Sequence, residues 1–226
     1  MSGNNLIVNN DGRKRRITTP LIALLIAVVI SIAFASVFVY YPMEVKLQPV
    51  QPPVYFETGS NAGAYDLGGY GTPYTSNTIS VSISIGSKAT SLTITVHPTY
   101  QVTYYKNVSI VYNNDDKSYK VCFRVETPLS DLPSGSKAYL YIYSQDGTRS
   151  LSGYPTPTPS GYLAQIDLTS TSNGATCVGT LDPNKFYEMD LYIYIPEGNN
   201  VGMTSGTTYT ANLLLIYTPQ TLETPP

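Results

Sequence analysis

"TISVSISIG", residues 78–86, sets the fold class of this chain because every second residue in it is apolar. The isoleucines and valine from Ile79 to Ile85 share one face of an extended strand, and serines occupy the other face. "SLTITVH", residues 91–97, repeats the alternation with leucine, isoleucine and valine against threonine. Both segments therefore predict half-buried β-strands.

The same type of segment recurs along the rest of the chain. Turn sequences such as "NNDDK", "SQDG", "TSNG" and "PEGNN" separate the segments and are too short for helical crossovers. About nine strands in all predict an all-β domain over residues 78–220, an antiparallel sandwich of the jelly-roll or immunoglobulin-like kind. The further segments are "YQVTYYKNVSIVY" (100–112), "SYKVCFRVE" (118–126), "KAYLYIYS" (137–144), "YLAQIDL" (162–168), "CVGTL" (177–181), "FYEMDLYIYI" (186–195) and "TTYTANLLLIY" (207–217).

Composition narrows the classes of function. Only 12% of the 226 residues are charged and the net charge is −2, so no basic surface for nucleic acid is expected. Tyrosine is abundant at 21 residues while tryptophan is absent. This composition is typical of an exported β-protein rather than a cytosolic enzyme.

The sequence of the N-terminal region predicts that it inserts into a membrane, at least during export. Four basic residues, 13–16, precede an uncharged stretch from Pro20 to Tyr41, which places the following domain outside the cytoplasm. The small residues Ala33 and Ala35 fit a signal peptidase site, so residues 1–35 are predicted as a signal peptide that leaves Ser36 at the new N-terminus. The alternative is an uncut membrane helix over residues 20–41.

Between this stretch and the sandwich lie two further segments. Residues 36–53 are predicted to form a detached strand punctuated by prolines, and residues 54–77 a loop rich in glycine and tyrosine. The detached strand has the spacing needed to complete the open sheet of a neighbouring copy by strand addition. The residues predicted to face inward are Val37, Val39 and Tyr41, or Val45 and Leu47. Residues 221–226 are predicted as a C-terminal tail.

Three stretches of the domain resemble a known family. "YYKNVSIVYNNDDKSYKVCFRV", "GTLDPNKFYEMDLYIYIPEGNN" and "GTTYTANLLLIYTPQ" are similar to the camelysin/TasA biofilm fibre proteins, and most to the archaeal bundling pilins and surface threads. The resemblance implies a jelly-roll subunit exported by a signal peptide, whose freed N-terminal segment inserts as a strand into the next subunit. A second resemblance, of "RRITTPLIALLIAVVI" to archaeal type IV pilin leaders, implies cleavage before Ile17 and a retained helix.

Residues suited to catalysis are few. The single histidine, His97, cannot build a histidine-rich metal site or a Ser-His-Asp triad with recognisable flanking motifs, so neither an enzyme nor a cofactor is predicted. Asp115, Asp116, Asp146 and Glu197 lie in turns, where such residues are chosen for backbone geometry, and a calcium site is the alternative.

Two kinds of covalent modification are predicted. Cys122 and Cys177, the only cysteines, are expected to form one disulfide in an exported protein, although Cys122 shares its strand face with Lys120 and Arg124. Asn107 lies in the sequon Asn-Val-Ser and is a candidate for glycosylation.

Tyrosines alternate with aliphatic residues in "AYLYIYS" and "YEMDLYIYIP". They predict either packing across strands or a face that meets a neighbour or a sugar. The function predicted first is a structural subunit of an extracellular filament at the cell surface, with the chain itself as partner, and with signal peptidase and the membrane as partners during export. The alternatives are a type IV pilin and a membrane-anchored adhesin domain that binds sugar.

Overall fold

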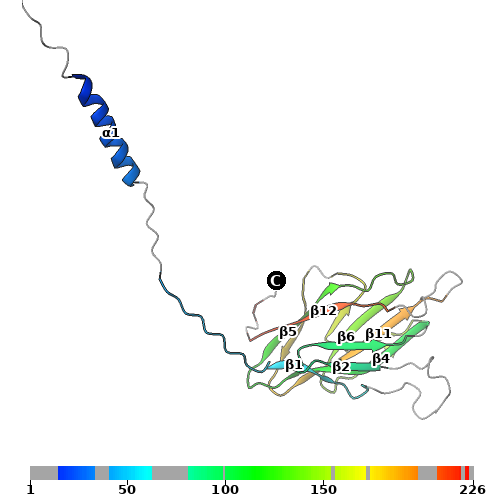
Figure 1. Cartoon of the computed structure of the whole chain (residues 1–226). Helices are drawn as coiled ribbons and strands as arrows, with labels where there is room; N and C mark the ends of the chain where they lie inside the picture. Colours follow the sequence, from blue (N-terminus) through cyan, green and yellow to red (C-terminus); the bar gives the residue numbers. More distant parts are fainter. Residues whose placement is uncertain are drawn as a thin grey trace, which may run out of the picture. The chain divides into compact units, whose positions relative to one another are not determined.

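The computed structural model describes residues 15–33, 41–62, 81–98, 100–153, 156–171, 174–197, 208–219 and 222–223 (Figure 1). The chain divides into two compact units, Met1–Pro49 and Val50–Pro226, and each is described by itself.

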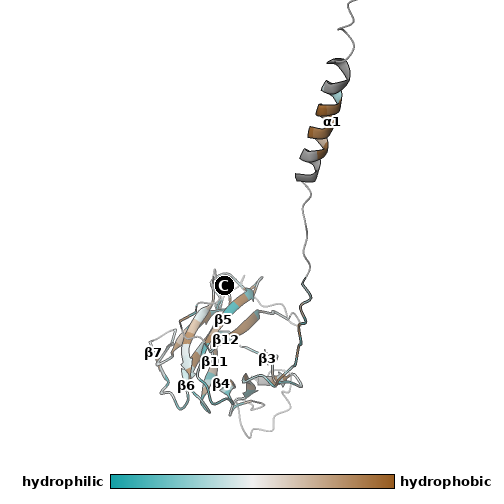
Figure 2. Cartoon of the chain, turned by 90° about the vertical axis from the view of Figure 1, so that its left-hand side faces the viewer, coloured by the Kyte–Doolittle hydropathy of each residue, from teal (hydrophilic) through white to brown (hydrophobic). Residues whose placement is uncertain are grey.

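The first unit contains one helix, α1, over Arg15–Ala33. Its described middle is apolar, as Figure 2 shows, and Leu21 and Leu24 are exposed. Within the part of the chain that the structure describes, no helix has the length and apolar character needed to cross a membrane. Residues 41–50 form neither helix nor strand, and all of them are exposed.

The second unit is all-β, as the alternation predicted, and each strand pairing in the described residues is antiparallel. Its strands are β1 (Val54–Thr58), β2 (Val81–Ile85), β3 (Leu92–Val96), β4 (Gln101–Asn113), β5 (Tyr119–Thr127), β6 (Lys137–Ser144), β7 (Ser150–Ser152), β8 (Thr158–Ser160), β9 (Ala164–Asp167), β10 (Thr176–Leu181), β11 (Phe186–Ile195) and β12 (Asn212–Thr218).

The strands form two main sheets and two hairpins. One sheet has five strands in the order β1-β4-β11-β6-β9, and the other has three in the order β10-β5-β12. β2 pairs with β3 and β7 with β8. β10 and β5 lie near β9, whereas β2 lies near β1 and β4, so the small sheet and the β2–β3 hairpin approach the large sheet at different strands.

A single hydrophobic cluster joins both main sheets. Alternate residues of β5 and β11 enter it, among them Val121 and Phe123 from the small sheet and Met189 and Leu191 from the large one, each at most 7% exposed. The period of two seen in the sequence is therefore the period with which side chains enter this cluster, because successive side chains of a strand point to opposite faces, although β11 is buried on both faces.

The nine strands predicted from alternation correspond to β2 to β6 and β9 to β12, and the described residues contain three more. β1 corrects the predicted boundaries, because the expected loop 54–77 begins with a strand that pairs with β4 along Val54–Thr58. Pro53, just before β1, does not interrupt the ladder, since proline is tolerated at the start of a strand. Residues 63–77 of that loop lie outside the described residues.

Candidate assembly site

β12 is an edge strand that carries no protective charge. It pairs with β5 along Asn212–Thr218, with one register shift between Asn212 and Leu213, and no other strand in the described ranges pairs with it. Its sequence, NLLLIYT, has no charged residue and no proline. Edge strands of monomeric proteins are usually short, charged, bulged or covered, because an open row of backbone N–H and C=O groups templates further pairing. β12 therefore has the features of a surface that accepts another strand.

The core is incompletely covered beside this edge. Leu213, Leu215 and Tyr217 of β12 pack against the main cluster but remain half-buried. Their partners on β5 are 0–3% exposed. The core side chains of β12 are therefore more exposed than those of the neighbouring strand β5, although both strands point apolar side chains into the same core.

The β2–β3 hairpin shows the same partial exposure. Ile83, Leu92, Ile94 and Val96 also pack against the main cluster and are also half-buried. Among the strands of the described ranges, β2 and β3 pair only with each other. The apolar core is thus left partly open to water along β12 and along the hairpin.

The segment before the domain presents the complementary feature. Tyr41, Met43, Val45 and Leu47 are 85%, 83%, 66% and 89% exposed. The polar side chains between them carry opposite charges, and Lys46 Nζ lies 3.4 Å from a carboxylate oxygen of Glu44. Residues 41–48 therefore have the alternation of a half-buried strand, while the described structure gives them no strand to pair with.

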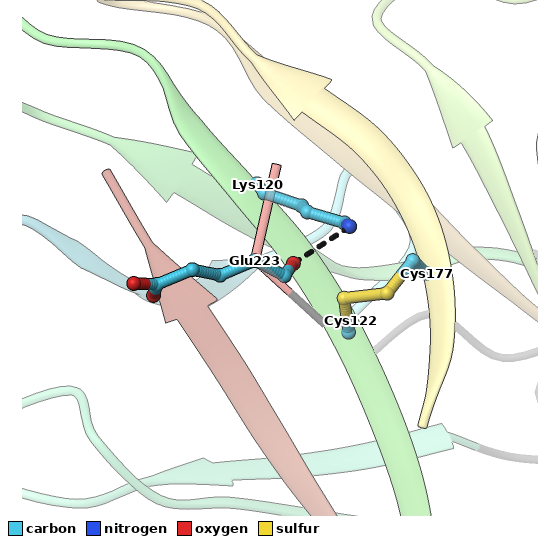
Figure 3. The surroundings of a disulfide bond; sticks show 4 residues. All are labelled: Lys120, Cys122, Cys177 and Glu223. Atoms are coloured by element: carbon cyan, nitrogen blue, oxygen red, sulfur yellow. Dashed lines mark hydrogen bonds between the residues drawn. A yellow bond between two sulfur atoms is a disulfide. The ribbon is translucent and has the colours of Figure 1, made fainter. Parts of the chain in front are cut away.

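The disulfide predicted from the cysteine count lies in the small sheet. Cys122 of β5 stands directly opposite Cys177 of β10, and their sulfurs are bonded at 2.07 Å (Figure 3). Cys122 shares its face with Lys120 and Arg124, as the sequence indicated, and is nevertheless only 1% exposed. Lys120 Nζ donates a hydrogen bond of 2.8 Å to the main-chain oxygen of Glu223 on the same side.

The five-stranded sheet contains a buried polar network that was not predicted from the sequence. It centres on a bulge of β4, where residues 106–108 stand opposite the single residue Asp190 of β11. Asn107 adopts a φ of 44°, a conformation that asparagine tolerates better than most residues. Its backbone N–H donates to Asp190 Oδ1 at 2.7 Å, and its Nδ2 donates to Glu188 Oε1 at 2.9 Å. The two carboxylates thereby hold the bulge.

Arg149, just before β7, neutralises part of this negative charge. Its Nε donates to Asp190 Oδ2 at 2.7 Å, and its guanidinium also contacts the carboxylate of Glu188. The central carbon of the guanidinium, Cζ, lies 4.5 Å from the ring centroid of Tyr143. Burial lowers the pKa of Arg149, but the hydrogen bonds to the two carboxylates raise it by more. Asp190 is 0% and Glu188 7% exposed, so these charges are satisfied by protein groups rather than by water.

Tyrosines cover the rest of this face. Tyr141, Tyr143 and Tyr192 are at most 5% exposed and form a cluster, and Tyr162 packs over Tyr141 with ring centroids 4.8 Å apart. Burial, followed by the hydrogen bond to Asp190, raises the pKa of Tyr104. The alternation of tyrosine in β6 and β11 thus serves packing across strands within one chain, one of the two interpretations that the sequence allowed.

The geometry of Asn107 argues against the glycosylation predicted there. The side chain is 8% exposed and its Nδ2, the atom that would carry a sugar, is hydrogen-bonded to Glu188 in the interior. The folded domain does not present this nitrogen to an enzyme. A sequon reports only three residue types, whereas the bulge that buries Asn107 depends on the register of β4 with β11.

The remaining predicted residues fall in different places. Ala35, Ser36, Val37 and Val39 lie outside the described residues, and Ala33 is the last residue of α1. His97 is exposed just after β3. Asp115 accepts a hydrogen bond from Tyr119 in the turn between β4 and β5. Within the described ranges, no group of three or more acidic, histidine or cysteine side chains has the arrangement of a metal site.

The chain matches no known protein family model, and no curated protein is similar to it at a significant level.

Proposed function

We propose that this protein is a structural subunit of an extracellular filament at the cell surface, and that it polymerises with copies of itself. One observation carries the proposal: within the described residues, the chain presents both an uncharged edge strand that pairs with another strand on one side only, beside a half-open core, and an exposed segment with the alternation of a missing strand. An exposed sheet edge binds an extended segment by main-chain hydrogen bonds, with pockets for alternate side chains.

In the proposed mechanism, export removes residues 1–35 by cleavage after Ala35. Signal peptidase is the partner in this step, and the membrane is met only during export. The freed segment, residues 36–53, then becomes the donor strand for the next subunit. Because each subunit donates at one end and accepts at another, the contact is head-to-tail and does not close, so it propagates as a filament.

The finer fold assignment belongs to the same proposal. We infer a jelly-roll or immunoglobulin-like sandwich, in agreement with the camelysin/TasA-like resemblance. The support is that two antiparallel sheets share one core and that sequence neighbours such as β4 and β5 lie in different sheets. Connections that pass from one sheet to the other are typical of sandwich folds.

Deletion of residues Ser36 to Gln48 from the exported protein tests the function. We expect a folded monomer that elutes as a single species, retains its disulfide and forms no filaments by electron microscopy. The same monomer should bind a synthetic peptide of residues 36–53. Filaments of normal appearance from the deleted protein would refute the donor role.

A sugar-binding surface domain is the second candidate, and one observation favours it. Tyr162 is 37% exposed and Tyr139 and Tyr194 are half-buried on the outer face of the large sheet. Rings in this position can stack on a sugar and keep their hydroxyls in water. Binding of the soluble monomer to a glycan array, abolished by Tyr162→Ala, would support this function over the filament.

A further inference from the structure

The prolines around the exposed segment limit which of its residues can join a sheet. Pro42 and Pro49 lack the N–H group that a ladder needs, so an uninterrupted donor strand extends from Met43 to Gln48. Within it, Met43, Val45 and Leu47 share one face. Glu44 and Lys46 share the other, where their ion pair stays in water.

The open side of β12 offers a matching set. Its half-buried core side chains are also three, with Leu213 and Tyr217 at the ends and Leu215 in the middle. In an antiparallel or a parallel pairing centred on these triplets, the middle residues are direct neighbours. Direct neighbours on one face of paired strands have Cβ atoms about 5 Å apart.

The other edge strands of the two main sheets, β1, β9 and β10, are less suited than β12 to accept a further strand. β1 is partly covered, since Phe56 N–H donates to Ala89 O at 2.9 Å. β9 has only four residues and ends on Asp167, and the register of β10 shifts between Cys177 and Gly179. A short, charged or bulged edge resists strand addition, whereas β12 has seven uncharged residues and its register with β5 shifts only at its first residue, between Asn212 and Leu213.

We propose that β12 is the acceptor edge and that Met43–Gln48 of the next copy pairs with it, with Val45 opposite Leu215. The occupant is thus a second copy of this chain. This inference rests on the proposed function and specifies its interface, since filament formation alone does not say which edge accepts the donor. The inserted Met43, Val45 and Leu47 would cover the half-buried side chains of β12.

Disulfide trapping tests the inference in the exported full-length protein. The variant carries Val45→Cys and Leu215→Cys, and the native cysteines do not compete because they are bonded to each other. Its matched control carries Lys46→Cys with the same Leu215→Cys, which moves one thiol to the opposite face of the donor strand. After mild oxidation, we expect a ladder of covalent oligomers on a non-reducing gel, at least tenfold stronger for Val45→Cys than for the control.

The outcomes separate the interface from the function. Filaments that form without cross-linked oligomers would overturn β12 as acceptor while leaving the filament role intact. A cross-link within one chain, seen as a monomer of altered mobility, would overturn the second copy as occupant. Loss of filaments in the deletion of Ser36 to Gln48 reports on the function itself.

A second measurement covers the case in which the double variant does not assemble. A synthetic peptide of residues 41–50 with a photoreactive group in place of Val45 is irradiated with the otherwise unaltered protein. Mass mapping of the adduct to β12 supports the inference, and an adduct on β2–β3 or on the tyrosine face of the large sheet overturns it.

Discussion

Arg149 and Asp190 form a buried ion pair, with Arg149 Nε 2.7 Å from Oδ2 of a carboxylate that is 0% exposed. The pair ties the segment before β7 to the middle of β11. Together with Glu188, Asn107 and Tyr104, it pairs both buried carboxylates of the large sheet with donors from within the chain, while Asn107 Oδ1 is buried without a hydrogen-bond partner. The buried charges of that sheet are thus paired within the chain, whereas the edge at β12 is open on one side within the described residues.

Replacement of Arg149 by alanine is expected to destabilise the domain by about 3–5 kcal/mol, because it leaves two buried carboxylates without their cation. Arg124→Ala is the matched control, since the Arg124–Glu126 pair is 30% and 43% exposed and such pairs contribute about 0–1 kcal/mol. Urea unfolding of both variants measures the difference. Equal losses in the two variants would show that the network does not stabilise the fold.

Asn107 is predicted to carry no sugar in the native protein, because its Nδ2 donates to Glu188 in the interior. The intact mass of the peptide containing Asn107 checks this, and a glycan on it would contradict the buried position. Asn107→Ala is expected to cost about 1–3 kcal/mol through the lost hydrogen bond. Asn107→Gly should cost about 1 kcal/mol less, since glycine accepts the φ of 44° without strain.

The sequence predicted strands well and the polar network not at all, for a physical reason. Alternation is a local property, so β11 was visible in "FYEMDLYIYI" from its own residues. The network depends on which strands pair and on a two-residue shift in the register of β4, neither of which is local. One signal was present: Glu188 and Asp190 fall on one face of an otherwise apolar strand, and buried carboxylates require a cation or strong donors.

The missed strands have a similar explanation. β1 follows two prolines and has only five residues, so its alternation of Val54 and Phe56 is brief. β7 and β8 have three residues each, too few for a period to be recognised. Cys122 differs from these strands. Alternation alone places it on the same face as Lys120 and Arg124, but its burial depends on β10 and β12, the strands on either side of β5.

Alkaline pH is expected to destabilise the domain. Burial, with the charge of Asp182, raises the pKa of Tyr187 from 10.0 to about 12. A group whose pKa is raised by folding contributes stability that is complete below its unfolded pKa and is lost as the pH rises toward its folded pKa. The free energy of unfolding should therefore fall between about pH 10 and pH 12.

Tyr187→Phe removes this titration, so its stability should decline less steeply over the same interval than that of the unaltered protein. Tyr100→Phe is the control, because Tyr100 is 47% exposed. Denaturant unfolding at a series of pH values gives both slopes. Identical slopes for the two variants would rule out Tyr187 as a source of the alkaline sensitivity.

Removal of the disulfide is expected to destabilise the domain without changing its fold. Cys122 and Cys177 are 55 residues apart, and closing a loop of that size contributes roughly 4 kcal/mol in the chain-entropy model. The double variant Cys122→Ala, Cys177→Ala should keep the circular dichroism of a β-protein and unfold at lower denaturant. An unchanged midpoint would argue that the bond does not constrain the unfolded chain.

Two adjacent residues of β12 separate assembly from folding. Leu215 faces the half-open core and Leu214, which is 43% exposed, faces the opposite side beside Arg124. Leu215→Glu places a carboxylate where the donor segment of the next copy would cover it, and burial of an unpaired charge costs several kcal/mol. Since about 1.4 kcal/mol is a factor of ten in affinity, subunit association should weaken by about a hundredfold or more. Leu214→Glu introduces the same charge beside Arg124, on the exposed face where Glu44 and Lys46 of the donor segment would lie in water, so it should weaken assembly far less than Leu215→Glu. Sedimentation of filaments at increasing protein concentration measures both variants, and circular dichroism verifies that each is folded. If the two variants assemble equally well, the donor strand does not enter beside Leu215, and β12 is not the edge that joins the subunits.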